Sequence, residues 1–560
     1  MIMPRYEVKQ MAKKRFDGWL IVSILLLLVF IAVLIYPLYG IIRQAVIMPD
    51  GSFSTEQFAK FFKNSYYVDT LYNSFKITIF VTVMTLVIGI PFAYFYAFYK
   101  LKGAKILFVI SILCCMSAPF LGAYSWIMLL GRSGVITKFF KSVLHITLPS
   151  IYGFRGIALS QTLKFFPLVF IYMNGAFKNI DNTLLEASAN MGCTGVKRLF
   201  KIVLHLTMPT ILAATLMVFM QAFADFGTPT VLGEGFKTFP VLLYNEYLGE
   251  NGANYNFAAA LAIIAVVVTA IIFFLQKWAT GRFKFSINAM HSVVKKEPKG
   301  IGGVLMHLYC YILCAIAFLP QIYIVYLSFR NCKGSIFSDG YSLVNYHQAV
   351  KKKLLLASKN TVIMGAVALA IIIIIAVILA YLVVRRSSTL NHSLDTIAML
   401  PYIMPGAVIG IALLIAYGAE PFALTGTMII MILSFAIRRM PYTIRSATAT
   451  LMQIPLSIEE AAISLGASKL KTFVKITVPM MSNGILSGAI LSWVAIVTEL
   501  SSSVILYSNR TTTLTMQAYI YIGRGEYGTA AAFAAILTVI TALSLIIYMA
   551  VSKSEDDIQL

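Results

Sequence analysis

The chain has 560 residues, of which 59% are hydrophobic and only 12% are charged. A soluble protein of this length would carry about twice that share of charged residues, so the composition, with a mean hydropathy of +0.84, excludes an ordinary soluble enzyme or binding domain. The formal net charge of +23 does not indicate a nucleic-acid partner, because the basic residues stand in short loops beside apolar segments and form no basic soluble domain.

Apolar segments of about 20 residues, long enough to cross a bilayer, recur along the whole chain. They are expected to be helices, because a helix satisfies its own backbone polar groups in lipid. The sequence therefore predicts an all-α membrane protein of about 12 transmembrane helices in two six-helix halves. The first half is predicted to span at 19–46, 71–98, 106–131, 155–177, 209–232 and 256–277. The second half is predicted to span at 304–329, 359–384, 393–418, 425–447, 483–506 and 529–551.

The basic residues of the loops predict the orientation of these spans. Lysines and arginines gather before the first span, after the second, between the halves and after the eighth, and all of these positions fall on one side. The positive-inside rule makes that side the cytosol, so both termini are expected there. Lys351, Lys352 and Lys353 fall on the other side, in a longer loop where the rule is weaker.

A short polar motif occurs twice, 274 residues apart. Positions 186–192 read Glu-Ala-Ser-Ala-Asn-Met-Gly, and positions 460–466 read Glu-Ala-Ala-Ile-Ser-Leu-Gly. The same offset relates other residues of the two halves, which indicates an internal duplication. The predicted units are a first repeat at 1–280 with its motif loop at 178–208, a basic cytosolic linker at 281–303, and a second repeat at 304–560 with its motif loop at 448–482.

Each copy of the motif is predicted to form a short capped helix. Asp181 or Asn182 is expected to cap the first helix and Ser457 the second, because their side chains can accept a hydrogen bond from the first free N–H groups. Gly192 and Gly466 are expected to adopt positive φ and to end the helix in a sharp turn. The result would be a compact cytosolic projection suited to docking in a groove of a partner.

The second copy resembles the signature of permease subunits in binding-protein-dependent ABC importers. It has Glu460-Ala461-Ala462, Gly466, Ile476 and Pro479 at the family's spacing, whereas the first copy departs from the pattern at Ser188 and His205. The resemblance covers essentially the whole chain and implies the type I importer permease fold, with two halves related by a pseudo-twofold axis. It also implies that the motif forms the coupling helix. The residues to which this role transfers are Glu186, Ala187, Gly192, Glu460, Ala461 and Gly466.

The resemblance implies specific partners. These are a separate ABC ATPase subunit, expected as a homodimer, an extracytoplasmic substrate-binding protein docked on loops such as 47–70, 132–154 and 331–358, and the bilayer of a bacterial cytoplasmic membrane. The sequence contains no phosphate-binding loop of the pattern G-x-x-x-x-G-K-[ST]. ATP is therefore expected to be hydrolysed by the partner, and this chain is expected to be a transport subunit that is no enzyme and binds neither cofactor nor metal.

The substrate is indicated by one stretch and by the ionisable residues of the spans. Residues 223–229, Phe-Ala-Asp-Phe-Gly-Thr-Pro, resemble fused two-repeat permeases for ferric iron; related permeases serve 2-aminoethylphosphonate, polyamines or thiamine. Ionisable residues inside spans usually face a pathway or each other. The candidates, paired by the 274-residue offset, are Asp225 with Glu499 and Lys164 with Arg438.

These four residues leave alternatives open. The acids can face a cation and the bases an anion or a chelated oxyanion, or the four can form ion pairs with one another. A secondary transporter driven by an ion gradient is the more distant alternative for the whole chain. Such a carrier would have no need of the repeated motif.

Overall fold

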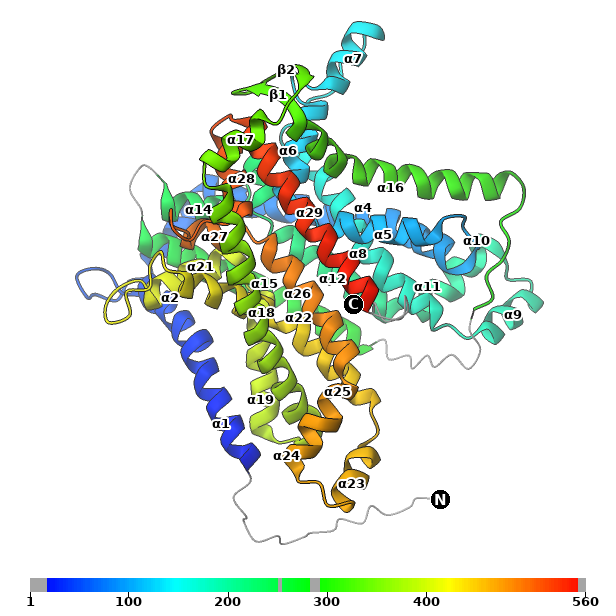
Figure 1. The fold of residues 1–560 in the computed structure, drawn as a ribbon, viewed down its shortest axis with the longest axis vertical. Helices are drawn as coiled ribbons and strands as arrows, with labels where there is room; N and C mark the ends of the chain where they lie inside the picture. Colours follow the sequence, from blue (N-terminus) through cyan, green and yellow to red (C-terminus); the bar gives the residue numbers. More distant parts are fainter. Residues whose placement is uncertain (1–17, 250–253, 283–292, 552–560) are drawn as a thin grey trace.

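The structure is a computed structural model that describes residues 18–249, 254–282 and 293–551. Residues 283–292 of the predicted linker lie outside the described residues, as do both ends of the chain. Helices make up most of the described chain, and their arrangement is shown in Figure 1.

Seven stretches of helix among the described residues are continuous, long and apolar enough to cross a membrane, and each confirms one predicted span. They are α1–η1–α2 (Gly18–Val46), α4 (Ser65–Phe98), α8 (Phe154–Lys178), α15 (Tyr255–Arg282), α16 (Gly300–Phe329), α18 (Leu354–Arg385) and α29 (Tyr527–Val551). The predicted span 425–447 is α22 (Met428–Gln453), which is less apolar because it carries three arginines.

The predicted single helices at 106–131 and 393–418 are wrong, because each span is broken. The first consists of α5 (Ala104–Met116) and α6 (Pro119–Leu130), and the second of α19 (Thr389–Ala398), α20 (Leu400–Ile403) and α21 (Gly406–Tyr417). The chain bends by 102° and 112° at these breaks. Ala118 and Met404, which each precede a proline, are extended, since proline disfavours helical geometry in the residue before it.

The predicted spans 209–232 and 483–506 are also two helices each. The first contains α12 (Met208–Phe223) and α13 (Gly227–Leu232), and the second α26 (Ser482–Val497) and α27 (Ser503–Leu506). Asp225 and Glu499 therefore lie at a break between helices and not within a transmembrane helix, which corrects their predicted setting.

The duplication is confirmed by the helices that surround the motif. Four successive elements after α8 recur after α22, and each begins and ends 274 residues later. The pairs are α9 (Asn182–Asn190) with α23 (Leu456–Ser464), α10 (Gly195–Arg198) with α24 (Lys469–Thr472), η2 (Leu199–Val203) with η3 (Phe473–Thr477), and α11 (Leu204–Leu206) with α25 (Val478–Met480). Helices α12 and α26, which follow, keep the same offset.

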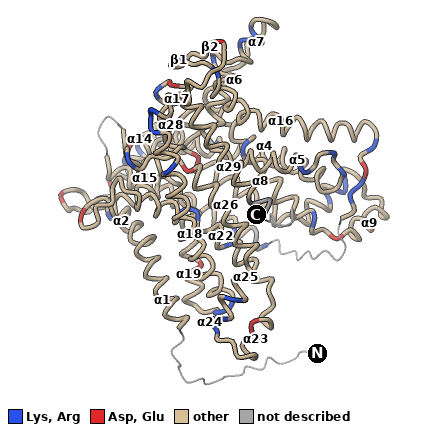
Figure 2. Tube along the Cα trace, in the orientation of Figure 1, with Lys and Arg blue, Asp and Glu red and all other residues tan. Residues whose placement is uncertain are grey.

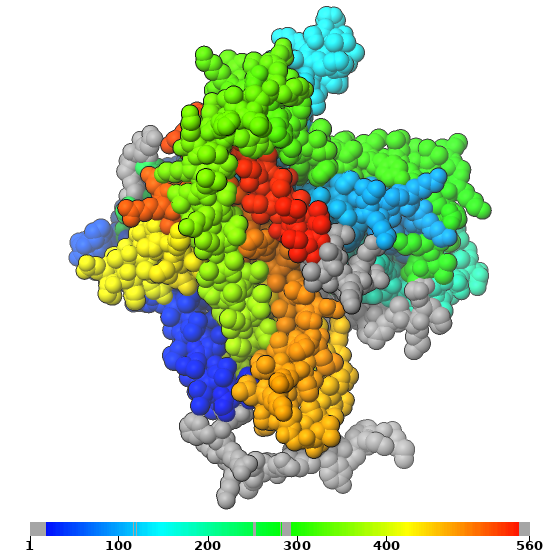
Figure 3. Space-filling model, in the orientation of Figure 1, coloured from blue at the N-terminus to red at the C-terminus, as the bar shows by residue number. Residues whose placement is uncertain are grey.

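Short elements in the predicted external loops project from the end of the molecule opposite α23. They are α7 (Val135–Val143), the antiparallel hairpin of β1 (Arg330–Lys333) and β2 (Ile336–Tyr341), and α17 (Val344–Lys351). A further short helix, α3 (Glu56–Lys63), lies in the first predicted external loop. Figure 3 shows α7 and the hairpin projecting at the top and α23–α24 at the bottom. The hairpin adds two strands to a predicted all-α chain, because Gly334 adopts positive φ and allows a tight turn.

Helices α22 and α26 pack closely through the pattern Gly484-x-x-x-Gly488. A Cβ atom at Gly488 would lie 2.7 Å from the Cα of Thr443, so the two backbones meet there almost without side chains between them. Small residues at this spacing allow such an approach between membrane helices. The hydroxyls of Thr443 and Ser492, 2.8 Å apart, add a hydrogen bond between the same helices.

We predict that Gly488→Ala destabilises the protein by about 1–3 kcal/mol, because the new methyl group meets backbone and overpacking has that typical cost. Gly175→Ala is the matched control. Gly175 lies within α8 with no atom within 4 Å of an added Cβ, so its replacement should be neutral or stabilising by up to about 1 kcal/mol. Thermal unfolding of the purified variants measures both effects. Equal melting temperatures for the two would contradict the close packing.

Candidate functional site

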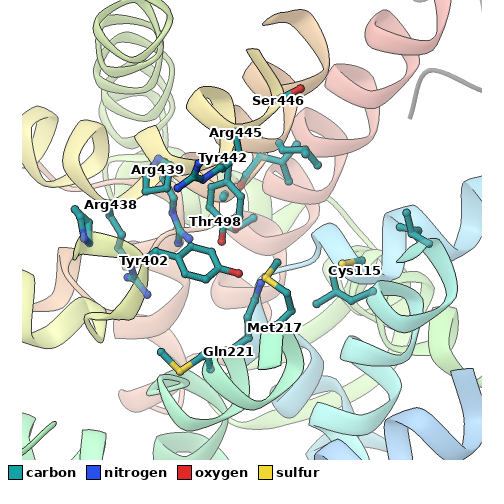
Figure 4. A pocket seen from close by; sticks show the side chains of 18 of the residues that line it. Cys115, Met217, Gln221, Tyr402, Arg438, Arg439, Tyr442, Arg445, Ser446 and Thr498 are labelled. Carbon is teal, nitrogen blue, oxygen red and sulfur yellow. The ribbon is translucent and has the colours of Figure 1, made fainter. Parts of the chain in front are cut away.

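A cavity of about 970 Å³ opens between the two halves of the chain. Helices α5, α8 and α12 of the first half and α20, α22 and α26 of the second contribute to its wall. Figure 4 shows Arg438, Arg439 and Tyr442 of α22 on one side of this space and Cys115 and Met217 of the first half on the other. The cavity thus lies at the interface where the duplication predicts a pathway.

All four ionisable residues singled out in the spans line this cavity. Lys164 comes from α8 and Arg438 from the corresponding position of α22, while Asp225 follows α12 and Glu499 follows α26. The structure therefore brings together two pairs of residues that are 274 positions apart in the sequence.

The two carboxylates occupy equivalent places at the breaks. Asp225 Oδ1 accepts a hydrogen bond from the backbone N–H of Thr228 at 3.3 Å, and Glu499 Oε1 accepts one from the N–H of Ser502 at 3.2 Å. Each acid thus satisfies a free N–H group at the beginning of the next short helix, where a negative charge also suits the helix dipole.

The two acids differ in their remaining partners. Asp225 Oδ2 accepts a hydrogen bond from the Gln161 side-chain amide at 2.9 Å. Glu499 forms ion pairs with Arg438 through one oxygen and with Arg439 through the other. Arg439 has no basic counterpart in the first half, so the two halves carry different charge at equivalent sites.

Lys164 forms no ion pair with any acid among residues 18–249, 254–282 and 293–551. Its ammonium group lies 5.4 Å from the centre of the Phe165 ring. It is within electrostatic range of Asp225, Arg439 and Glu499. A basic group without a salt bridge therefore faces the same space as the arginine pair.

Several polar residues of the wall were missed by the sequence reasoning. They are Tyr172, Gln221, Tyr402, Tyr442 and Arg445. The repeat could not reveal Tyr442 and Arg445, because their counterparts in the first half are Leu168 and Ile171. A usable signal was present in α22, where Arg438, Tyr442 and Arg445 are spaced by four and three residues and so share one helix face.

The two motif helices lie at the periphery of the molecule, α9 at the right and α23 at the bottom of Figure 1. Asp181 caps α9 by accepting a hydrogen bond from the N–H of Thr183 at 2.9 Å, as predicted. The predicted cap Ser457 is wrong, because α23 begins one residue earlier, after Pro455, and has no side-chain cap. Gly192 and Gly466 have φ of 75° and 87°, which confirms the predicted turns.

The motif residues Glu186, Ala187 and Gly192, and equally Glu460, Ala461 and Gly466, are exposed. Apolar side chains beside them are exposed as well, at positions related by the 274-residue offset. Met191 is 78% and its counterpart Leu465 is 90% exposed. We call these two projections the first knob (182–198) and the second knob (456–472). Figure 2 shows lysines and arginines close to both.

The two knobs differ in the contacts of one equivalent position, Leu185 in the first and Glu459 in the second. In the second, the buried carboxylate of Glu459 pairs with Arg385 of α18 at 2.8 Å, and Arg385 also donates to the carbonyl of Ile454 at 2.7 Å. In the first, the position of Glu459 is taken by Leu185, whose carbonyl accepts a 3.4 Å hydrogen bond from Arg198. The second knob is therefore tied to α18 by a charge pair that the first knob lacks.

We predict that Glu499→Gln costs about 3–5 kcal/mol of stability, because it leaves two largely buried guanidinium groups, 13% and 15% exposed, without their shared counter-charge. Asp225→Asn is the matched control in the other half and should cost about 1 kcal/mol, since Asp225 is held by uncharged donors. Thermal unfolding of the two purified variants compares them. A loss at Asp225→Asn as large as at Glu499→Gln would contradict the ion-pair assignment.

The sequence of this chain is similar to those of known transport proteins. The chain is 28% identical over 543 residues to a ferric transport system permease protein of Actinobacillus pleuropneumoniae, which covers 95% of this chain and 78% of that protein. It is 24% identical over 268 residues to a putative 2-aminoethylphosphonate transport system permease protein of Salmonella typhimurium, covering 47% of this chain and 92% of that one. Among solved structures, a bacterial ABC transporter involved in the import of the acidic polysaccharide alginate matches 48% of this chain and 97% of its own, with 20% identity and a TM-score of 0.42.

The family comparison covers both halves. The model of the binding-protein-dependent transport system inner membrane component matches residues 69–285 and again residues 372–555. This double match includes both knobs and most of the cavity wall. The chain therefore belongs to the family of binding-protein-dependent transport system inner membrane components, as an ABC permease with two fused repeats.

Proposed function

We propose that this permease imports ferric iron delivered by an extracytoplasmic binding protein, driven by ATP that a separate ATPase subunit hydrolyses. The iron assignment is supported by similarity over 95% of the chain to a ferric transport permease. The coupling assignment rests on one observation above all. The two knobs have matching geometry, and their apolar side chains Met191 and Leu465 are exposed in the part of the chain that the structure describes.

Each knob presents the features of a docking helix. The exposed carboxylates Glu186 and Glu460 stand on knobs that each expose several large apolar side chains, Met191 and Val196 in the first and Leu465 and Leu470 in the second. More than one exposed apolar side chain on a small projection favours a protein contact. Ala187 and Ala461 keep this face flat, and Gly192 and Gly466 end it in a turn. Two equivalent knobs suit a homodimeric ATPase, with one knob in each subunit.

The orientation that follows places both knobs and both termini in the cytosol of a bacterial cell. The predicted loops 47–70, 132–154 and 331–358, which contain α3, α7 and the hairpin, then face the binding protein. Lys352, one of the lysines that depart from the positive-inside rule, pairs with Glu526 in this region.

In the transport cycle, the units that move are the repeats 1–280 and 304–560, which the linker 281–303 joins. ATP would bring the two ATPase subunits together around the knobs, and the halves would rock about the cavity between them, opening it alternately to each side. ATP is bound by the partner, and this chain contributes no cofactor. Membership in a binding-protein-dependent family favours this mechanism over transport driven by an ion gradient.

We predict that the double variant Glu186→Lys, Glu460→Lys loses most ATPase co-purification, because it reverses the charge at both docking faces. Glu297→Lys is the matched control. It reverses an exposed acid outside the knobs, whose ion pair with Lys100 at 2.8 Å is exposed on both sides and contributes at most about 1 kcal/mol. Pull-down of the ATPase with the tagged permease measures the effect. Unchanged recovery with the double variant would contradict the role of the knobs.

We predict that deletion of the chain, with its partners retained, abolishes ATP-dependent uptake of radiolabelled ferric iron. Re-expression of the wild type should restore uptake, and the double knob variant should not. Unchanged uptake after deletion, in cells without another iron importer, would contradict the iron assignment. The coupling assignment would not be affected, because the pull-down of the ATPase tests it separately.

A further inference from the structure

We propose that the cavity holds its substrate through an oxyanion, so that iron crosses as an anionic complex of ferric ion with carboxylate or phosphate and not as a bare cation. The iron part of this inference rests on the proposed function. The oxyanion part rests on the charges, hydrogen bonds and unpartnered donors of the cavity wall.

The wall carries more basic than acidic groups. Its ionisable residues are Lys164, Arg438, Arg439 and Arg445 against Asp225 and Glu499. Arg445 is paired with Asp395 at 3.3 Å. With Asp395 included, the wall has four positive charges and three negative charges, so its net charge is positive. That charge attracts an anion and repels a trivalent cation, and screening by salt is weak in a partly buried site.

The two carboxylates of the wall are already engaged. Both oxygens of Glu499 are occupied by guanidinium groups, and both oxygens of Asp225 accept hydrogen bonds. A hard cation needs several anionic oxygen ligands converging on one point. Among the residues that the structure describes, no group of three or more His, Cys, Asp or Glu side chains is placed to hold a metal ion.

Donors, in contrast, remain available. The Lys164 ammonium has no salt bridge, and the buried Nε of Arg439 has no hydrogen-bond partner among the described residues. Tyr402 and Tyr442 line the same side, with ring centres 6.2 Å apart, and neutral phenols can donate to an oxyanion. Charge-assisted bonds from ammonium and guanidinium groups are the strongest contacts that a protein offers to carboxylate or phosphate.

Gly406, at the beginning of α21, indicates that packing holds Arg438 in its position in the cavity wall. A Cβ atom at Gly406 would overlap the guanidinium of Arg438, so the absence of a side chain there leaves the room in which Arg438 reaches Glu499. The same arginine faces the cavity. The basic wall is thus fixed by packing as well as by the ion pairs.

The test is double-label uptake into proteoliposomes that contain the permease with its ATPase and loaded binding protein. One arm supplies radioiron with carbon-labelled citrate and the other supplies radioiron with labelled phosphate. We expect one oxyanion to enter with the iron in a fixed ratio. Lys164→Gln should lower the uptake of both labels by roughly tenfold to hundredfold. Lys164→Arg should retain most of it, and the exposed Lys277→Gln at the end of α15 is the neutral control.

The outcomes separate this inference from the proposed function. Iron that enters while both oxyanions stay outside would overturn the inference and keep the iron assignment. If no iron enters but labelled 2-aminoethylphosphonate does, and this uptake requires Lys164, the oxyanion site stands and the iron assignment fails. Polyamines and thiamine are cations. Uptake of either one, with no uptake of iron or 2-aminoethylphosphonate, would overturn both the oxyanion inference and the iron assignment. Equal ATPase recovery with all variants shows that each remains folded.

Discussion

One carboxylate in each half ends a membrane helix and begins the next, and the central site depends on this arrangement. A helix end inside a bilayer leaves backbone N–H groups that lipid cannot satisfy. Asp225 and Glu499 supply the missing acceptor at the start of α13 and α27. Because the chain can break there, α12 and α26 stop beside the interface between halves, and the acids that allow the break become part of the cavity wall.

The same position is then held by different chemistry in the two halves. In the first half, Asp225 is bound by the neutral amide of Gln161, and in the second, Glu499 lies between two guanidinium groups. The knobs repeat this difference, since Glu459 forms a buried ion pair with Arg385 of α18, whereas its counterpart Leu185 offers only its backbone carbonyl to Arg198 of the same knob. Duplication has kept the backbone of both halves while their electrostatics have diverged.

The fold was largely predictable because two strong signals agree, apolar length and the 274-residue repeat. The repeat also pointed to Asp225 and Glu499, since it preserves an acid at both positions. The breaks beside these acids were not predicted, because hydropathy is judged over about 20 residues and one carboxylate barely changes it. The pairing of Glu459 with Arg385 had no local signal either, because 74 residues separate the two in the sequence.

The distribution of ion pairs restricts how the cavity can open. Separating Glu499 from either arginine would leave a buried charge without its partner, at a cost of several kcal/mol, so α22 and the end of α26 should move as one unit. The close contact at Gly488 ties these helices further. Among the described residues, no ionisable group of the wall in the first half forms a salt bridge with one in the second. Opening the cavity between Lys164 on α8 and the arginines on α22 therefore breaks none of these ion pairs, and this is where a bound oxyanion would link the two halves.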